Sequence, residues 1–412
     1  MTKLDKLIQE LCPDGVQFLR IPELFTTRNG YTPSKANSEF WENGTIPWFR
    51  MEDIRANGRI LTEATQCVSK KAVKGRVFPE NSIIVATSAT IGEHALIKVP
   101  SLANQRFTYL VLKDEFKSSV DMMFIFYYCF KLDEYCKTHL NQGNFASVDM
   151  KQFAEFHFPV PPLPVQREIV RILDNFTELT AELTAELTAE LTARKQQYAY
   201  YRDKLLDRPH DSTRIVTIGE LGSWSGGKTP SMDNSDYWEN GTTPWITSKD
   251  MKVSTLEDTE NHITEKAISE ASMTVYPPNG VAVVTRSGIL KHTLPVAFVP
   301  FATTVNQDIK MLVAGEGVLP RYAFHAIQGK SPDILAKAKK QGGTVDSLEF
   351  KKFLDYEIPL PSLEVQKRLV EVLDNFDAIC TDLSSGLPAE IEARQKQYEY
   401  YRDKLLSFEE KI

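Results

Sequence analysis

The chain has 412 residues, too many for one ordinary hydrophobic core, which predicts two or more domains. Its 42% hydrophobic and 25% charged residues are typical of a soluble globular protein, and no apolar run is long enough to span a bilayer. The net charge of −7 counts against a simple non-specific nucleic-acid binder, although local basic surface or partner subunits could still meet phosphates.

The cysteines and histidines indicate neither a disulfide framework nor a metal site. The five cysteines are odd in number and include no C-x-x-C pair, which is typical of buried free thiols in a reducing cytoplasm. The seven histidines are scattered and none lies in an H-E-x-x-H pattern. The N-terminus, Met1 to Leu7, lacks the apolar core of a signal peptide, so we expect a cytoplasmic protein.

Residues 1–158 are predicted to form a compact α/β domain. They contain short β-branched runs, such as Asn81 to Thr87, many turn residues and no long regular period. A proline-rich hinge follows from Phe158 to Pro164. Because proline fixes φ, this hinge should hold the domain at a set angle to the segment that comes next.

The spacer region 159–210 is predicted to be one long helix from about Pro164 to Leu206. Three tandem Thr-Ala-Glu-Leu copies lie between Thr180 and Leu191, and no glycine or proline follows Pro164 in the segment. At ~1.5 Å per residue, some 40 residues form a rod about 60 Å long. The spacing of four puts a drifting apolar stripe on this rod: Leu179, Leu183, Leu187 and Leu191.

A second α/β domain, 211–357, and a second helical spacer, 358–412, complete the chain. The domain contains a matching β-branched run, Gly280 to Thr285, and ends in the hinge Ile358 to Leu363. Ser384 to Pro388 interrupts the second rod, so we expect a kink or break there. The matching stripe, which predicts an antiparallel coiled coil with the first rod, is Ile379, Leu383, Leu387 and Ile391.

The two halves repeat each other at an offset of roughly 200 residues. Ala193 to Leu206 returns as Ala393 to Leu406, and Phe40 to Trp48 returns as Tyr237 to Trp245. Two like halves give a pseudo-two-fold axis, which suits a partner with two like ends, such as duplex DNA. The halves agree best at the hinges and rods, which indicates a common frame that carries two different readers.

Three short motifs suggest enzymes but lack the context that each requires. Gly222 to Thr229 fits a phosphate-binding loop, but Pro230 follows at once and no helical pattern comes after it. Pro332-Asp333 with Glu349 to Lys351 mimics a nuclease set, a pattern that arises often by chance. Tyr276 to Asn279 has the residues of an amino-methyltransferase motif in the wrong order. No catalytic constellation assembles from these residues.

One family combines a Thr-Ala-Glu-Leu array, proline hinges, two dissimilar domains and two similar rods. The chain resembles the specificity subunit of type I restriction-modification enzymes over essentially its whole length. The array at Thr180 to Leu191 is similar to that of the subgroup called type IC, and the Thr-Pro-Trp-type segments at 45–48 and 242–245 are typical of the family's target-recognition domains. The fold class that we expect is therefore α+β, with two similar α/β target-recognition domains separated by two long antiparallel helices in a pseudo-two-fold repeat.

The resemblance implies a non-catalytic subunit that reads a bipartite DNA sequence, one half with each domain. It implies two partner modification subunits, which carry S-adenosylmethionine and methylate adenine at N6 after the base is flipped out. It also implies restriction subunits, which use ATP and Mg²⁺ to translocate and cut DNA. This chain would hold no cofactor or metal. The residues expected at spacer and subunit contacts are the two stripes with Tyr198, Tyr201, Tyr398 and Tyr401.

Base recognition needs hydrogen-bonding side chains on exposed loops, arginine for guanine and asparagine or glutamine for adenine. Such asparagines also cap turns, which is the structural alternative. In the first domain the candidates are Arg50, Ser88, Asn104, Gln105 and Arg106. In the second domain they are Thr247, Lys249, Arg286, Lys291, Asn306 and Gln307. Trp48 and Trp245 are predicted as core residues rather than stacking platforms.

Two other functions stay open at this stage. The chain could be an autonomous methyltransferase or nuclease with duplicated domains, which turnover by the purified chain would reveal. It could also be a protein scaffold whose globular halves do not touch DNA, which a binding assay with a random duplex library would reveal.

Overall fold

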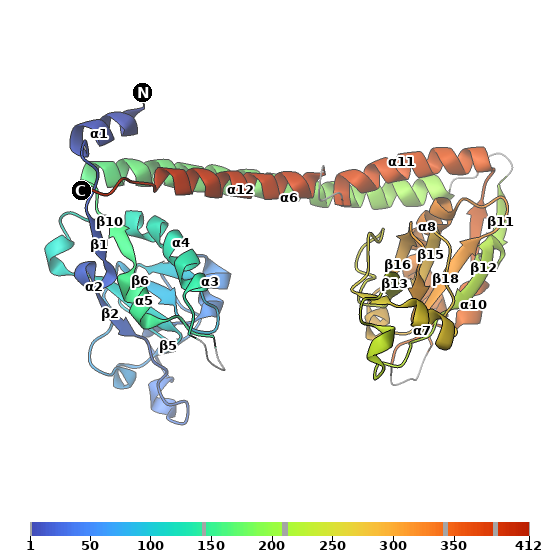
Figure 1. Ribbon diagram of the computed structural model, residues 1–412, viewed down its shortest axis with the longest axis horizontal. Helices are drawn as coiled ribbons and strands as arrows, with labels where there is room; N and C mark the ends of the chain where they lie inside the picture. Colours follow the sequence, from blue (N-terminus) through green and yellow to red (C-terminus); the bar gives the residue numbers. More distant parts are fainter. Residues whose placement is uncertain (1, 142–145, 208–212, 341–344, 382–385, 412) are drawn as a thin grey trace. The chain divides into compact units, whose positions relative to one another are not determined.

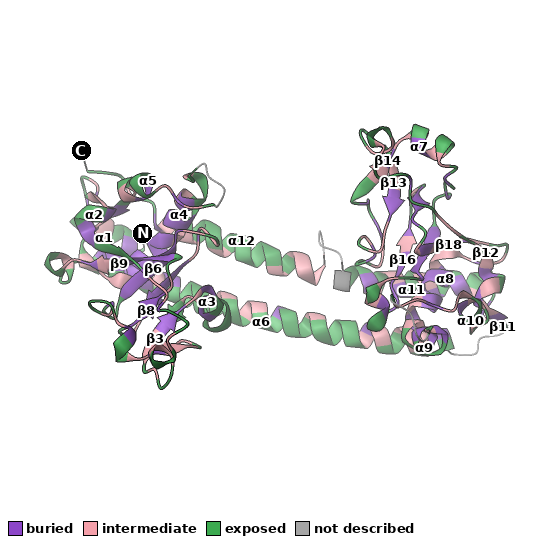
Figure 2. Ribbon diagram, turned by 90° about the horizontal axis from the view of Figure 1, so that it is seen from below, coloured by how far each residue is buried: buried purple, intermediate pink, exposed green. Residues whose placement is uncertain are grey.

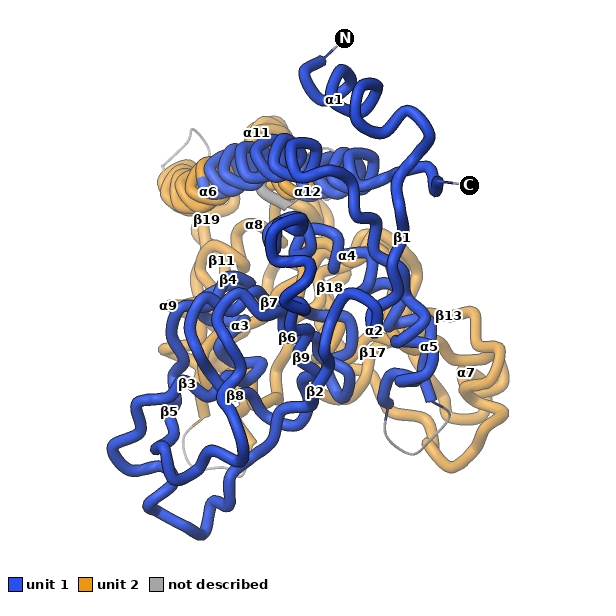
Figure 3. Tube along the Cα trace, turned by 90° about the vertical axis from the view of Figure 1, so that its left-hand side faces the viewer, with its two compact units in different colours: residues 1–185, 392–412 blue, residues 186–391 orange. Residues whose placement is uncertain are grey.

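The computed structural model describes residues 2–141, 146–207, 213–340, 345–381 and 386–411. The chain divides into two compact units, coloured separately in Figure 3: residues 1–185 with 392–412 form unit 1, and residues 186–391 form unit 2. Each unit therefore combines one globular half with the beginning of one rod and the end of the other.

The globular half of unit 1 is built on a five-stranded sheet in the order β2-β9-β6-β7-β4. Its strands are β2 (Phe25–Asn29), β9 (Phe107–Leu112), β6 (Ser82–Ala86), β7 (His94–Ile97) and β4 (Ile60–Leu61). All neighbours are antiparallel except β4 and β7, which are parallel. Every residue of β6 is buried, because this central strand is covered on both faces. Beside it lies a small sheet of β5 (Cys67–Val68), β3 (Ile46–Phe49) and β8 (Leu102–Ala103).

The helices of unit 1 cover the sheet and connect it to the rods. α4 (Met122–Thr138) contacts β6 and β7, and its buried face contains Phe124, Ile125 and Leu132. β1 (Phe18–Arg20) pairs with β10 (His157–Pro159) just before the hinge. The remaining helices are α1 (Lys3–Leu11), α2 (Ile21–Leu24), α3 (Met51–Asn57) and α5 (Met150–Glu155).

Unit 2 repeats this plan with a four-stranded sheet, β12-β18-β15-β16. Its strands are β12 (Gly222–Gly226), β18 (Ile309–Ala314), β15 (Gly280–Val284) and β16 (Val296–Val299), beside a small sheet of β14 (Asn261–Ile263), β13 (Thr243–Ile246) and β17 (Thr304–Val305). β11 (Arg214–Thr217) pairs with β19 (Glu357–Leu360). The helices are α7 (Glu265–Glu270), α8 (Pro320–Gly329), α9 (Ser331–Ala338) and α10 (Phe350–Leu354).

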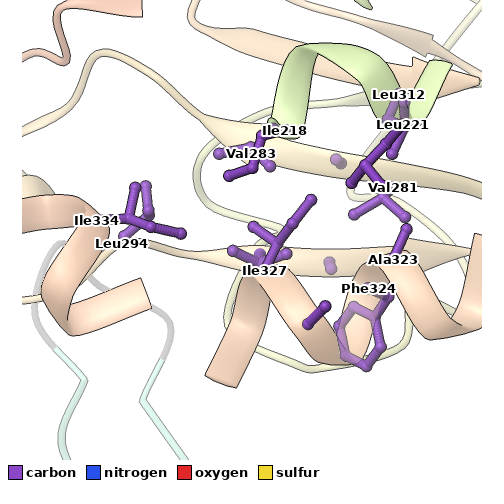
Figure 4. Packing of buried hydrophobic residues seen from close by; sticks show 14 of the residues in the cluster. Ile218, Leu221, Val281, Val283, Leu294, Leu312, Ala323, Phe324, Ile327 and Ile334 are labelled. Atoms are coloured by element: carbon purple, nitrogen blue, oxygen red, sulfur yellow. The ribbon is translucent and has the colours of Figure 1, made fainter. Parts of the chain in front are cut away.

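The core of unit 2 forms between α8 and the sheet, as Figure 1 and Figure 4 show. Phe324 and Ile327 of α8 face Val281 and Val283 of β15, and all four are buried. The expected α+β fold class with two similar α/β halves is confirmed by this shared architecture.

The first rod is one continuous helix, α6 (Leu163–Asp207), which confirms the helix predicted from Pro164 to Leu206. The second rod is described as α11 (Leu363–Thr381) and α12 (Leu387–Leu405). The predicted interruption falls largely on 382–385, which lie outside the described residues, as does Leu383. Pro388 occupies the first turn of α12, where a missing N–H costs no helical hydrogen bond.

The rods run antiparallel within each unit. In unit 1, Phe176 of α6 lies 6.1 Å from Tyr401 of α12 between ring centroids, and Thr177 shares a 2.9 Å hydrogen bond with Tyr398. In unit 2, Tyr201 of α6 lies 6.4 Å from Phe376 of α11. In unit 1, rising numbers on α6 meet falling numbers on α12, as expected for the antiparallel pair.

The leucine stripe is not buried uniformly along α6. Leu179 is 59% exposed, whereas Leu187 is only 8% exposed, and Leu183 and Leu191 are half-buried. Figure 2 shows that much of α6 is exposed, with half-buried positions between. A spacing of four residues turns the helix by about 40° beyond a full turn, so the leucines drift across its surface. On the second rod, Ile379 is exposed, and Leu387 and Ile391 are half-buried.

A buried glutamine locks each hinge to its globular domain. The Gln166 side chain donates to the carbonyl oxygens of Ser119 and Pro161 and accepts from the N–H of Asp121. Gln366 does the same in unit 2, where it donates to Gly317 and Pro361 and accepts from Leu319. These matched contacts align the beginning of α4 with that of α8, so that Tyr127 and His325 occupy equivalent positions.

A polar network joins each of these positions to both rods. In unit 1, the Tyr127 hydroxyl donates to Asp174 over 2.7 Å. In unit 2, Nε2 of His325 lies 2.7 Å from Asp374, and its Nδ1 lies 3.2 Å from the Tyr198 hydroxyl. A neutral imidazole satisfies both contacts, with Nε2–H donating to the carboxylate and Nδ1 accepting from the tyrosine. Burial lowers the pKa of His325, and Arg321 beside it acts in the same direction against the opposing effect of Asp374.

None of the helices in the described part of the chain combines the length and the apolar character needed to cross a membrane. Cys12, Cys67, Cys129 and Cys136 are free thiols.

Gly227 is predicted to be needed for the full stability of unit 2. A β-carbon at this position would lie 1.6 Å from the carbonyl oxygen of Val305, which accepts the N–H of Lys228. Gly227→Ala should therefore destabilise the protein by about 1–3 kcal/mol or more in denaturant unfolding. Gly288→Ala is the matched control, because nothing lies within 4 Å of that β-carbon. Equal unfolding midpoints for the two variants would contradict the packing.

His325 is predicted to make the stability of unit 2 depend on pH. Its pKa in the folded protein lies below 6.5, so the unfolded chain binds more protons. Its contribution is fully present above the unfolded pKa and is lost as pH falls through the folded pKa, at no more than about 1.4 kcal/mol per pH unit. Thermal unfolding between pH 8 and 5 would measure this loss. His325→Tyr, which copies Tyr127, should flatten the profile, and an unchanged profile would exclude His325 as its source.

Candidate nucleic-acid interface

Each unit brings two of its predicted loop segments together beside the small sheet. β3 runs parallel to β8 in unit 1, and β13 runs parallel to β17 in unit 2. At the strand ends, Asn104 donates its backbone N–H to Phe49 over 3.0 Å, and Asn306 donates to Ile246 over 3.0 Å. Arg50 and Thr247 directly follow these acceptors, so each is held beside an Asn-Gln pair.

The asparagines of these pairs cap their own turns. The Asn104 side chain accepts the backbone N–H of Arg106, and the Asn306 side chain accepts that of Asp308, both over 3.0 Å. Asn306 is only 8% exposed. Their side-chain oxygens therefore shape the loop, which is the alternative role considered for asparagines at these positions.

The glutamines that follow are exposed and anchored at one atom. Gln105 accepts a hydrogen bond from the Thr32 hydroxyl, and Gln307 accepts one from the Thr229 hydroxyl. Thr32 and Thr229 were not among the predicted contacts. The internal repeat could have indicated them, because each lies two residues after a glycine that packs closely against backbone, Gly30 or Gly227. The same arrangement explains why Gly222 to Thr229 matches a phosphate-binding loop, because Gly227 is there to allow close backbone packing. Within the described range 213–340 no long helix directly follows this segment, and the next helical turn is the short η5 (Ser235–Tyr237).

A third segment reaches the same turns from the central strand of each large sheet. Thr87, after β6, donates its N–H to the Arg106 carbonyl oxygen over 2.9 Å. Thr285, after β15, donates to the Asp308 carbonyl oxygen over 2.7 Å. Ser88 therefore lies beside Arg106, and Arg286 beside Asp308. Unit 1 thus gathers Arg50, Ser88, Asn104, Gln105 and Arg106, and unit 2 gathers Thr247, Arg286, Asn306 and Gln307.

The other predicted contacts differ in how far their side chains are available. Arg50 is half-buried, with its guanidinium 5.8 Å from the Trp48 ring. The Thr247 hydroxyl donates to Asp250 and accepts from the N–H of exposed Lys249. Lys291 is exposed at the end of the short helix η6 (Gly288–Lys291). Among the described residues, no hydrogen bond or ion pair joins Lys291 to the turn of Asn306.

The two tryptophans are buried, as predicted for core residues. Trp48 and Trp245 are 3% and 6% exposed. Their ring N–H groups donate to the carbonyl oxygens of Tyr31 and Lys228. The described residues include no cluster of three or more metal-ligating side chains.

Comparison with known proteins identifies the family. The sequence model of the type I restriction modification DNA specificity domain matches residues 13–193 and 211–393. The type I restriction enzyme EcoprrI specificity subunit of Escherichia coli is 39% identical over 93% of this chain and 92% of its own length. The EcoR124I/EcoR124II specificity subunit of the same organism is 48% identical over 61% of each chain, so this match spans about three fifths of that relative.

Two solved structures share the fold. One is a chain from a structure that describes complex assembly and conformational transition of the type I R-M system. It has a TM-score of 0.70, with 17% identity and coverage of 96% of this chain and 98% of that one. The HsdS subunit from Thermoanaerobacter tengcongensis has a TM-score of 0.53, with 16% identity and coverage of 96% and 97%. The chain belongs to the type I restriction-modification DNA specificity family and is a specificity subunit of that family.

Proposed function

We propose that this specificity subunit reads a bipartite DNA target, one half-site with the loop cluster of each unit. The observation that carries the proposal is the pair of matching clusters, built on the same backbone contacts but with different side chains. Phe49–Asn104 and Ile246–Asn306 are equivalent backbone pairs, whereas Arg106 is replaced by Asp308 and Ser88 by Arg286. Different side chains on one frame suit two different base sequences.

The chemistry is supplied by partners, which are two modification subunits with S-adenosylmethionine for adenine N6 methylation and restriction subunits with ATP and Mg²⁺. The rods offer each modification subunit a similar surface, because Phe176 with Tyr401 and Phe376 with Tyr201 form one aromatic pair in each unit, and the tyrosine of each pair is exposed. Tyr201 and Tyr401 are 41% and 42% exposed, and Leu179 and Ile379 extend the apolar surface. Tyr198 is buried and Tyr398 half-buried, so they support the surface from below.

We propose that this chain belongs to the type IC subgroup, and the array in α6 supports this proposal. The array consists of three Thr-Ala-Glu-Leu copies between Thr180 and Leu191. We infer that the array determines the length of the non-specific spacer between the half-sites. The domain bounds that we propose are 1–158 and 211–357 for recognition and 159–210 and 358–412 for the spacers.

Assaying the assembled methyltransferase on a random duplex library tests the proposal as a whole. Methylation of one bipartite motif is the expected result. The chain purified alone, with S-adenosylmethionine or with Mg²⁺ and DNA, should give no turnover, whereas turnover would identify an autonomous enzyme. A complex that assembles but binds no DNA through this chain would identify a scaffold.

Exchange of residues 1–158 for the equivalent domain of another specificity subunit should change one half of the methylated motif. Each loop cluster is held by contacts within its own unit, so the half-site read by unit 2 should stay the same. Genome-wide mapping of methylated adenines measures both halves. A change in both half-sites would refute independent recognition.

Deletion of Thr184 to Leu187 should shorten the spacer of the target by about one base pair. The deletion removes about 6 Å of α6, and base pairs rise about 3.4 Å along the duplex axis. The hinges must absorb a rotation of about 40° beyond a full turn. The half-site sequences should be unchanged in the methylated motif. Retained activity with the original spacer would show that the array does not determine its length.

A further inference from the structure

We propose that Arg286 recognises a guanine in the half-site read by unit 2, and that Asp308 is the positioning residue that holds its guanidinium for this contact. The inference rests on the proposed function and adds to it a named reader, a base type and a supporting carboxylate. Asp308 was not among the residues predicted from the sequence.

Asp308 is fixed within its turn before it meets the arginine. Its backbone N–H donates to the Asn306 side chain over 3.0 Å. Its carbonyl oxygen accepts the N–H of Thr285 over 2.7 Å and the Thr285 hydroxyl over 3.0 Å. Its side chain is only 22% exposed. The carboxylate is therefore a fixed point on the rim of the loop cluster rather than a free surface group.

Arg286 is attached to this point by one edge of its guanidinium. Nε lies 2.6 Å from Oδ1 of Asp308, and the arginine side chain is 55% exposed. This pair is the only ion pair or hydrogen bond of the Arg286 side chain with a residue in the described ranges. The two terminal nitrogens remain available as parallel donors, the arrangement that matches O6 and N7 of guanine in the major groove.

The Asp308 carboxylate lowers the entropic cost of base recognition, because it restricts the Arg286 side chain before DNA binds. A free arginine loses side-chain freedom on binding, whereas a guanidinium already held at Nε has less freedom to lose. Exposed Gln307 lies on the same turn, next to Asp308, so the held arginine and an amide are presented together. If Arg286 and Asp308 formed only a surface ion pair, the turn would not need the buried Asn306 side chain to cap it, and it would not need an exposed glutamine beside Asp308.

Unit 1 provides an internal comparison. Ser88 occupies the position of Arg286, and Arg106 occupies that of Asp308. In unit 1 the arginine therefore lies in the turn after β8, whereas in unit 2 it lies in the segment after β15. Arg106 is exposed and makes no ion pair with any residue that the structure describes. The carboxylate-supported arginine is therefore a feature of unit 2, and its effect should be confined to one half-site.

The test uses the assembled methyltransferase with Arg286→Lys, Asp308→Asn or Arg214→Lys in this chain. Relative methylation rates are measured on duplexes in which each base pair of the unit 2 half-site is changed in turn. Arg286→Lys keeps the charge but loses the fork, so discrimination at one G·C pair should fall by about 5- to 150-fold. Asp308→Asn should cause a smaller loss at the same pair. Arg214→Lys, an exposed control on β11, should change nothing.

Retained recognition of the unit 1 half-site reports that each variant complex has assembled. If the wild-type complex methylates a bipartite motif and Arg286→Lys discriminates as well as wild type at every position, the inference is wrong while the proposed function stands. The inference is also wrong if the unit 2 half-site contains no G·C pair. If Arg286→Lys does not assemble, Asp308→Asn decides, and unchanged discrimination by that variant overturns the proposal. Absence of a bipartite motif in the wild type would instead refute the proposed function.

Discussion

A buried glutamine at the beginning of each rod is the constraint on which the rest of the architecture depends. Gln166 and Gln366 are fully buried, and each makes three hydrogen bonds that join the hinge to the start of α4 or α8. A buried amide that loses its partners is costly, so hinge, helix and globular domain are held as one piece. Each loop cluster therefore keeps a fixed orientation relative to the first turns of its own rod.

The two units share this backbone arrangement but carry different side chains at positions that take no part in the hydrogen bonds of Gln166 and Gln366. Tyr127 and His325 both reach an aspartate at the beginning of a rod, by a hydroxyl in one unit and an imidazole in the other. The loop clusters vary more freely, since Ser88 with Arg106 becomes Arg286 with Asp308. The backbone contacts beneath them stay the same, which lets a reader change without a change of fold.

The rods join the units and also present duplicated surface. Polar and small residues of the tetrapeptides keep much of α6 exposed, while aromatic pairs lie near the ends of the rods in each unit. Two equivalent pairs in one chain suit two copies of one partner. Packing of the unit and the proposed docking surface therefore involve different residues of one helix: Tyr198 packs inward, and Tyr201, three residues later, remains exposed.

The sequence by itself determined the features that depend on local chemistry and on repetition. Helix-forming tetrapeptides predicted α6, prolines predicted the hinges, and the internal repeat predicted two like domains with matched loops. Pro230, together with the lack of an apolar helical pattern after it, argued against a phosphate-binding helix after Gly222 to Thr229. The roles of Asn306, Asp308 and His325 were decided only by tertiary structure. Arg286 and Asp308 are 22 residues apart, and Tyr198 and His325 are 127 apart, so folding alone brings these polar atoms within hydrogen-bonding distance. Local patterns carry no information on such pairings, because each partner's side chain is compatible with many other environments.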